Sequence, residues 1–328
     1  MISEKNAIVR SSNGTIFKVS VNPSLHKDRL KPGARVTLNQ DTLAIIDVLQ
    51  DGWDPLVTGA EVSDKPTITF EQIGGLDTQI KLLREAIELP LTEPELFTKV
   101  GITPPKGVLL TGPPGCGKTM IAKAVAANAD ATFIQLVGSE LAQKYIGEGG
   151  RLVRELFALA QEKSPSIIFI DEIDAIGAKR LDTATSGDRE VQRTLMQLLA
   201  ELDGFNPLDS VKIIAATNRP DILDDALLRP GRFDRIIEIP LPNDEARRGI
   251  FDINIKNMAT SNIKIKNIIA ASEGFSGADI KAMCVEAGMQ AIRDRRDKVL
   301  SKDFTAALKI TEKMRKNSES DKINTLYS

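Results

Sequence analysis

The stretch that decides the fold is Gly112-Pro113-Pro114-Gly115-Cys116-Gly117-Lys118-Thr119. It matches the pattern G-x-x-x-x-G-K-[ST], with an apolar run at Val108–Leu110 before it and a helix-forming stretch at Met120–Asn128 after it. Glycines let successive backbone N–H groups turn inward around phosphate oxygens, and the helix N-terminus favours negative charge. The stretch therefore predicts a phosphate-binding loop between a strand and a helix.

This loop predicts ATP and Mg²⁺ as cofactors. The ammonium group of Lys118 is expected to neutralise the β- and γ-phosphates, and the hydroxyl of Thr119 is expected to bind Mg²⁺. The alternative, a Gly/Pro turn with an unrelated lysine, is disfavoured because a strand and a helix flank the pattern. The residues expected to contact nucleotide here are Gly112, Pro114, Gly115, Cys116, Gly117, Lys118, Thr119 and Met120.

Two acids follow the next buried run, Ile167–Ile170. Neighbouring strand residues point to opposite faces, so Asp171 and Glu172 can serve different roles at the carboxyl edge of a sheet. We expect Asp171 to hold Mg²⁺ through water and Glu172 to deprotonate the attacking water. A strand that simply runs into a polar loop is the alternative, and the upstream phosphate-binding loop weighs against it.

Polar residues also follow the run Ile213–Ala216 and surround a Pro-Gly turn further on. The amide of Asn218 can hydrogen-bond the γ-phosphate or the lytic water, although an asparagine turn before Pro220 is by itself the commoner explanation. Arg229 and Arg232 flank the turn, where a rigid guanidinium suits a phosphate presented by a neighbour. Surface solvation is the alternative for these arginines.

Short buried runs alternate with helical stretches from Gly107 onward, which predicts an α/β domain with a parallel sheet between helices. After Pro242 the pattern becomes helical, and before Val62 short alternating runs with turn residues predict a small β-barrel. The predicted domains are a β-barrel at 1–62, a linker at 63–72, an α/β domain at 73–242, a helical lid at 243–316 and a flexible tail at 317–328.

The composition excludes several classes of protein. His26 is the only histidine, which excludes a His-Glu-x-x-His zinc protease and a Ser-His-Asp triad within this chain. Cys116 and Cys284 are too few for a disulfide framework and suit a cytoplasmic, reducing setting. A formal net charge of -2 predicts no nucleic-acid partner, and no apolar run predicts a membrane span.

Taken together, the phosphate-binding loop, Asp171-Glu172, Asn218 and the stretch Leu228–Asp234 resemble the AAA+ ATPases. The stretches Gly187–Thr194 and Leu202–Phe205 resemble the proteasomal branch of that family. The resemblance implies an oligonucleotide-binding-type (OB-type) barrel, an AAA+ domain and a lid, assembled as a homohexamer. It also implies ATP-dependent unfolding and translocation of protein substrates into the proteasome core particle, whose gate opens when its α-ring is engaged.

The same resemblance implies further site residues. Arg229 and Arg232 match arginine fingers that reach the neighbouring subunit's γ-phosphate, so hydrolysis is expected to require a ring. The remaining matches have these implied roles: Asp203, Gly204 and Phe205 for signalling between subunits; Ile73, Gly74, Gly277 and Ala278 around adenine; Lys144, Tyr145, Ile146 and Gly147 as the pore loop; and Leu326, Tyr327 and Ser328 as the docking tail.

Two departures from the family and two alternatives stay open. The sequence begins at or inside the barrel, without the coiled coil that usually precedes it, so either it is a fragment or the coiled coil is absent in nature. Asn254 stands where most relatives have a histidine near the nucleotide. An unfoldase that works without a protease is one alternative function. A nucleic-acid motor or clamp loader is the other, and the barrel argues against it because it lacks a basic, aromatic-rich stripe. Substrates, recognition tags and the firing order of subunits are not encoded in these motifs.

Overall fold

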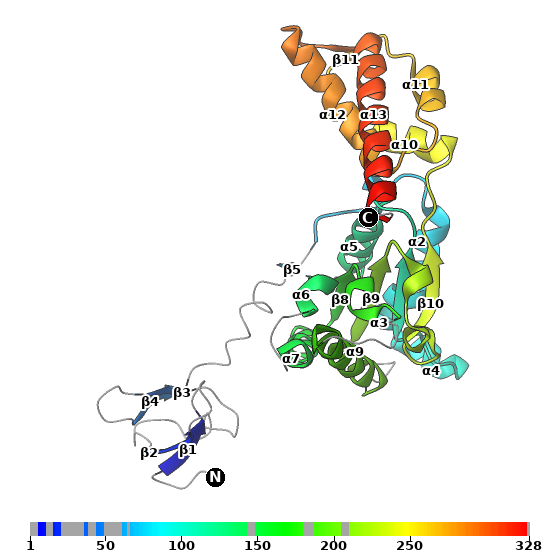
Figure 1. Ribbon diagram of the computed structural model, residues 1–328. Helices are drawn as coiled ribbons and strands as arrows, with labels where there is room; N and C mark the ends of the chain where they lie inside the picture. The colour runs from blue at the N-terminus through cyan, green and yellow to red at the C-terminus, as the bar shows by residue number, and fades with distance from the viewer. Residues whose placement is uncertain are drawn as a thin grey trace. The chain divides into compact units, whose positions relative to one another are not determined.

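A computed structural model describes residues 6–10, 16–20, 36–38, 44–48, 61–63, 66–142, 148–179, 186–204 and 210–326 (Figure 1). The chain divides into two compact units, Met1–Gly59 and Ala60–Ser328. Each unit has a hydrophobic core of its own.

The first unit contains two antiparallel pairs of strands, which the sequence predicted as short β runs. β1 pairs with β2, and β3 pairs with β4. Ala7, Val19 and Ile45 form a small buried cluster, and Phe17 and Val36 are among the residues that pack against it. The strands are β1 (Asn6–Arg10), β2 (Ile16–Ser20), β3 (Val36–Leu38) and β4 (Ile45–Val48).

The second unit is built on a six-stranded sheet with the order β10-β6-β9-β8-β7-β5. All neighbouring pairs are parallel except β5 and β7, which are antiparallel at the edge. Because parallel strands end on the same side, the residues that follow β6, β8 and β9 meet at one carboxyl edge. The strands are β5 (Glu61–Ser63), β6 (Gly107–Thr111), β7 (Thr132–Val137), β8 (Ser166–Asp171), β9 (Val211–Thr217) and β10 (Phe233–Glu238).

Helices cover both faces of this sheet, as the buried runs predicted. One face shares a buried cluster with α5, and α7 and α9 pack against each other outside that cluster, with α7 contacting β8 (Figure 1). The elements are η2 (Phe70–Gln72), α2 (Asp77–Leu83), η3 (Arg84–Glu88), α3 (Leu89–Thr92), α4 (Pro94–Val100), α5 (Lys118–Asn128), α6 (Gly138–Leu141), α7 (Glu148–Glu162), α8 (Asp174–Gly177), α9 (Ser186–Gly204), η4 (Pro220–Ile222) and η5 (Asp225–Leu228).

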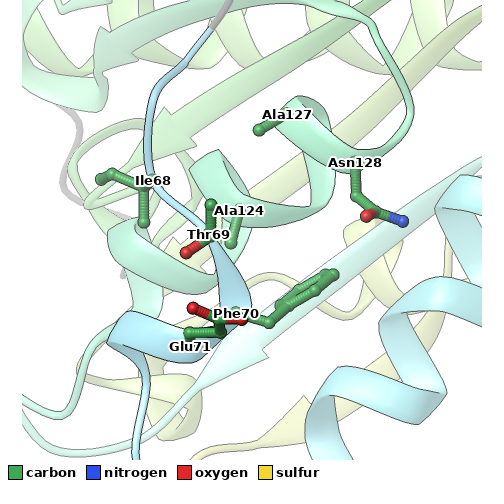
Figure 2. Close-up of a pocket in the computed structure, with 7 residues that line it drawn as sticks. All are labelled: Ile68, Thr69, Phe70, Glu71, Ala124, Ala127 and Asn128. Atoms are coloured by element: carbon green, nitrogen blue, oxygen red, sulfur yellow. The ribbon is translucent and has the colours of Figure 1, made fainter.

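The segment before α2 runs along α5 and forms a pocket of about 360 Å³ with it (Figure 2). Ile68, Thr69, Phe70 and Glu71 line one side of this pocket, and Ala124, Ala127 and Asn128 line the other. Phe70 also packs against the buried cluster beneath the sheet. The pocket therefore lies where the chain enters the α/β domain.

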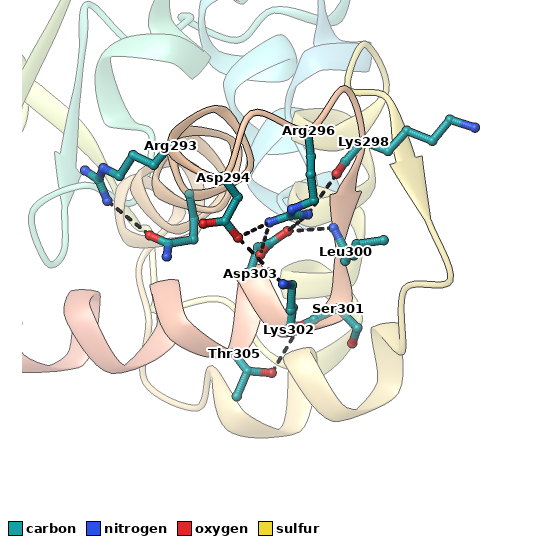
Figure 3. Close-up of polar contacts among 10 residues, drawn as sticks. Arg293, Asp294, Arg296, Lys298, Leu300, Ser301, Lys302, Asp303 and Thr305 are labelled. Carbon is teal, nitrogen blue, oxygen red and sulfur yellow. Dashed lines mark hydrogen bonds and ion pairs between the residues drawn. The ribbon is translucent and has the colours of Figure 1, made fainter.

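A helical lid follows the sheet and has a separate core. Phe251 and Phe304 are fully buried there, with ring centroids 5.2 Å apart in an edge-to-face arrangement. Figure 3 shows a polar cluster at its surface, in which Arg296 donates to both carboxylate oxygens of Asp303 at 2.9 and 2.7 Å. The lid elements are α10 (Asp244–Ile255), β11 (Thr260–Ser261), α11 (Ile265–Ala271), α12 (Gly277–Arg293), β12 (Val299–Leu300) and α13 (Ser301–Leu326).

Three features differ from the predicted boundaries. Glu61–Ser63 is β5 of the sheet rather than part of the barrel and linker, because it satisfies the open edge of β7. Strands do not stop after Pro242, since the two-residue strands β11 and β12 pair in the lid. α13 continues to Leu326, through the segment that was expected to be a flexible tail.

Candidate functional site

The phosphate-binding loop lies at the carboxyl edge of the sheet, between β6 and α5, as the sequence predicted. Lys118 is the first residue of α5, and only 7% of it is exposed. Its ammonium group donates to the carbonyls of Gly112 at 2.8 Å and Pro113 at 2.9 Å, and to Oδ1 of Asn218 at 2.6 Å. Burial lowers the pKa of Lys118, while Asp171 and Asp174 act in the opposite direction. The loop thus holds a buried cation where phosphates would bind.

Asp174 and Thr217 set the position of Asn218, and sequence reasoning missed both. The hydroxyl of Thr217 donates to Oδ1 of Asp174 at 2.7 Å and accepts from the backbone N–H of Arg219 at 2.9 Å. These bonds fix the residues on both sides of Asn218, so its amide can act from a defined place. The available signal was an acid three positions after Asp171.

The predicted metal ligands also lie together. The hydroxyl of Thr119 donates to Oδ2 of Asp171 at 3.0 Å. Asp171 also accepts from the backbone N–H of Glu172 through Oδ1 at 3.0 Å. A hydroxyl and a carboxylate are the oxygen donors that Mg²⁺ prefers, so these residues fit the ion.

Glu172 has a backbone φ of +50°, a conformation that non-glycine residues rarely adopt. Gly138, which follows β7, makes that conformation possible because a Cβ there would collide with the carbonyl oxygen of Glu172. Strained backbone of this kind often occurs at functional sites. Sequence reasoning missed Gly138, since its role depends on a contact between two strand ends.

The lid touches the phosphate-binding loop directly. The N–H of Ala278 donates to the carbonyl of Gly115 at 3.0 Å. Gly115 has a φ of +75°, and a Cβ there would lie 2.8 Å from both Cβ of Ala278 and Oγ of Ser276. Ser276 caps the N-terminus of α12 in a capping box with Asp279. The predicted pair Gly277 and Ala278 therefore lies beside the nucleotide loop.

The other residues that were predicted to lie near the nucleotide base contact or belong to α10. A Cβ on Gly74, next to Ile73, would lie 2.9 Å from the backbone nitrogen of Ile250. Asn254 donates from Nδ2 to the carbonyl of Ile250 at 2.7 Å, so its amide binds its own helix. Ile250 also approaches Gly277, with a Cδ1 atom 3.8 Å from the position of an added Cβ. Ile250 thus contacts both predicted pairs, and no sequence pattern pointed to it.

Cys116 is 9% exposed in the middle of the loop. Burial raises the pKa of its thiol, and the neighbouring Lys118 acts in the opposite direction. Met120 follows on α5 and is 40% exposed. The pocket of Figure 2 is separate from this loop, because its residues contact the other end of α5.

The two arginines lie at the opposite, amino edge of the sheet. They precede β10, whose first residue pairs with Gly107 at the start of β6. β6 has five residues, so at about 3.3 Å per residue the two edges are roughly 15 Å apart. Arg229 and Arg232 are therefore separated from their own phosphate-binding loop by the length of a strand.

Arg232 and Arg229 have different surroundings. Arg232 donates to the two carboxylate oxygens of Asp203 at 2.9 and 2.8 Å and to the carbonyl of Ala226 at 2.6 Å. The guanidinium lowers the pKa of Asp203, mainly through these hydrogen bonds. Arg229 is exposed, and within the described part of the chain its side chain forms no hydrogen bond or ion pair. Asp203 and Gly204 end α9.

Several predicted residues lie outside the described ranges. These are Lys144, Tyr145, Ile146 and Gly147 of the pore loop, Phe205 of the signalling segment, and Tyr327 and Ser328 of the tail. Leu326 is the last residue of α13.

Comparisons with known proteins agree with this architecture. Three family profiles match: "ATPase family associated with various cellular activities (AAA)" at residues 108–241, "AAA+ lid domain" at 262–306 and "Proteasomal ATPase OB C-terminal domain" at 1–50. The last profile confirms the predicted OB-type barrel.

Curated relatives extend the match over most of the chain. A proteasome-activating nucleotidase of Thermococcus onnurineus is 61% identical over 308 residues, which is 94% of this chain and 77% of the relative. Those of Archaeoglobus fulgidus and Saccharolobus islandicus are 60% and 58% identical, covering 94% and 98% of this chain and 78% and 82% of the relatives. The chain therefore belongs to the proteasomal branch of the AAA ATPases and is itself an ATPase.

Proposed function

We propose that this ATPase works as a homohexameric ring that unfolds proteins and threads them into the proteasome core particle. The name of its relatives, proteasome-activating nucleotidase, supports a proteasomal partner. The observation that carries the ring is the separation of Arg229 from its own phosphate-binding loop by the length of β6.

Within one subunit, the carboxyl edge would bind and activate the nucleotide. Thr119 and Asp171 would hold Mg²⁺, which neutralises charge on the phosphates. Glu172 would take a proton from the attacking water, while Lys118 and Asn218 would stabilise the charge that develops on the γ-phosphate. In this proposal the arginine that stabilises the transition state comes from outside this edge.

A second subunit would supply that arginine. Arg229 is exposed, belongs to a turn fixed by Gly231 and Asp234, and stands on the edge that faces away from its own loop. Head-to-tail packing of identical subunits generates rings, in which the amino edge of one subunit can meet the carboxyl edge of the next. Each site would thus be completed across a boundary between copies.

The remaining assignments rest on the resemblance of short segments to the family. Tyr145, within Lys144–Gly147, would grip an unfolded polypeptide in the central channel. Asp203, Gly204 and Phe205 would report the nucleotide state between subunits, and Leu326-Tyr327-Ser328 would dock between α-ring subunits and open the gate.

We further propose that the protein works in the cytoplasm. Both cysteines are free thiols, which suits a reducing compartment. Across the described residues, none of the helices combines the length and the apolar character that a membrane span needs.

The test is ATP-dependent degradation of an unfolded protein by purified core particle. We compare the wild type with Glu172→Gln and with a chain that lacks Tyr327-Ser328. We expect Glu172→Gln to abolish degradation and hydrolysis. The shortened chain should retain hydrolysis but lose stimulation of the core particle.

Two outcomes would favour the other functions. Unchanged degradation by the shortened chain would remove the docking role and favour an unfoldase that acts without a protease. ATPase stimulation by single-stranded DNA, with none by unfolded protein, would favour a nucleic-acid motor.

A further inference from the structure

Three segments that are distant in sequence meet at the amino edge of the sheet: the end of α9, the turn before β10, and Lys106 before β6. Lys106 bonds to both of the others. Its ammonium group donates to the carbonyls of Leu202 and Asp203, each at 3.2 Å, and its backbone N–H donates to Oδ2 of Asp234 at 3.0 Å.

The ammonium group of Lys106 donates hydrogen bonds where the end of α9 lacks donors. The last carbonyls of a helix have no partner within the helix, and a cation there also complements the helix dipole. Lys106 satisfies two carbonyls in the last turn of α9, the turn that carries Asp203. The direction of the Asp203 carboxylate is therefore tied to Lys106.

Asp203 and Asp234 then hold the turn from both sides. Asp203 binds two nitrogens of Arg232, while Asp234 accepts from the N–H of Gly231 and from Lys106. Gly231 has a φ of +92°, and Arg232 donates from its backbone to the carbonyl of Arg229 at 3.2 Å. The backbone that carries Arg229 is thus fixed, although the side chain of Arg229 projects into solvent.

We infer that Lys106 is a positioning residue for the arginine supplied across the subunit boundary: with Asp203 and Arg232 it forms a bracket that aims Arg229. This inference rests on the proposed function. In this bracket Arg232 bonds to Asp203 of its own subunit, and Arg229 is the arginine that reaches the phosphate in the neighbouring subunit. Exposed ion pairs add little to global stability, so the bracket sets the direction of a side chain more than it holds the fold.

The test uses rings mixed from two kinds of subunit, so that Lys106 can be replaced on only one side of each subunit boundary. Arg229→Ala subunits lack the donated arginine but keep their own carboxyl edge. Glu172→Gln subunits cannot hydrolyse but can donate Arg229. Each alone is expected to be inactive, and rings reassembled from an equal mixture are expected to regain hydrolysis.

Lys106→Met is then added to either partner. In the Glu172→Gln donor it should lower the regained kcat at least fivefold, whereas in the Arg229→Ala acceptor it should change kcat less than twofold. KM for ATP should stay the same in both, because the nucleotide loop lies at the other edge. Lys106→Arg in the donor should restore activity, and Lys99→Met, on exposed α4, serves as the matched control.

A purely structural role would reduce activity equally in donor and acceptor, and that result would overturn the inference. The same holds if Lys106→Met in the donor has no effect. Should Lys106→Met subunits fail to assemble, Asp203→Asn, which removes the partner of Arg232, must show the same donor-only loss. If the unmodified mixture regains no hydrolysis, arginine donation itself fails, and the inference fails with it.

Discussion

Glu172, which we propose as the general base, adopts a strained backbone, and Gly138 leaves room for that backbone. Gly138→Ala should therefore displace Glu172, since the added Cβ meets backbone atoms that cannot rotate away. We expect kcat to fall by roughly 10- to 100-fold, as small displacements of a catalytic group do, with little change in KM. Steady-state ATPase kinetics give both values.

Gly288→Ala is the control for Gly138→Ala, because the nearest atom to its Cβ is Cε of Met258 at an ordinary 3.5 Å. It should leave kcat unchanged. Equal losses in the two variants would show that Gly138 has no specific relation to Glu172.

Cys116 gives a second test at this scale. An alkyl group on its thiol would intrude where phosphates bind, so alkylation should block ATP binding. Because burial raises its pKa, little thiolate exists near pH 7, and the rate of alkylation should rise steadily toward pH 9. Binding of a fluorescent nucleotide after treatment measures the effect.

The thiol of Cys284 is the internal control. Burial raises its pKa to about 12, and it is 2% exposed in the lid core, so it should react far more slowly. Cys284→Ala should remain sensitive to the reagent and Cys116→Ala should resist it. Full sensitivity of Cys116→Ala would disprove the steric explanation.

The sequence could predict Lys118, Thr119, Asp171 and Asn218 because each follows a strand in a recognisable pattern, and the hydrogen bonds bring them together. It could not predict Gly138, Ile250 or Lys106. Their roles come from contacts between segments that only the folded sheet and lid bring together.

Among the elements, the lid depends on a core of its own around Phe251 and Phe304. Phe304→Ala removes a fully buried ring and should reduce the local stability of the lid by about 3–5 kcal/mol. Amide hydrogen exchange in α12 and α13 measures that opening free energy. Met314→Ala on the same helix, where Met314 is 66% exposed, should change it by less than about 0.5 kcal/mol.

Asp303 makes the lid sensitive to acid. The hydrogen bonds from Arg296 lower the pKa of Asp303 below its ordinary value of 3.8. Its contribution is therefore complete above pH 3.8 and is lost as the pH falls through the lower, folded-state pKa. Thermal unfolding of Asp303→Asn should begin from a lower midpoint at pH 7 and fall less steeply below pH 4. An equally steep fall of the thermal midpoint below pH 4 in the wild type and in Asp303→Asn would contradict this explanation.

Element positions were largely predictable where the pattern of apolar residues was clear, as for the continuous runs of β6 and β8 and the apolar face of α7. β5 was not, because Glu61–Ser63 has little apolar character and becomes a strand only by pairing with β7. The end of α13 was also missed, because Asn317–Thr325 is polar and offers no apolar period to mark a helix.

For the whole molecule, the two edges of the sheet would separate nucleotide binding from the proposed donation of Arg229. Arg229→Ala should lower kcat by about 10³-fold, the range found for arginine fingers, while nucleotide binding stays intact. Arg235→Ala, also exposed near that edge, is the matched control. Single-turnover hydrolysis and nucleotide binding distinguish the two effects. An Arg229→Ala protein with normal turnover, or a fully active monomer, would rule out the ring as proposed.

The hydrogen bond from Ala278 to Gly115 has a mechanical consequence. A nucleotide that rearranged the loop and a load that turned the lid would both act on this contact. Thermodynamic linkage requires reciprocity, so tension that tilts the lid must change the affinity for nucleotide by the factor with which nucleotide changes the tilt. In the proposed unfolding cycle, a substrate that resists translocation would thereby alter the affinity for nucleotide.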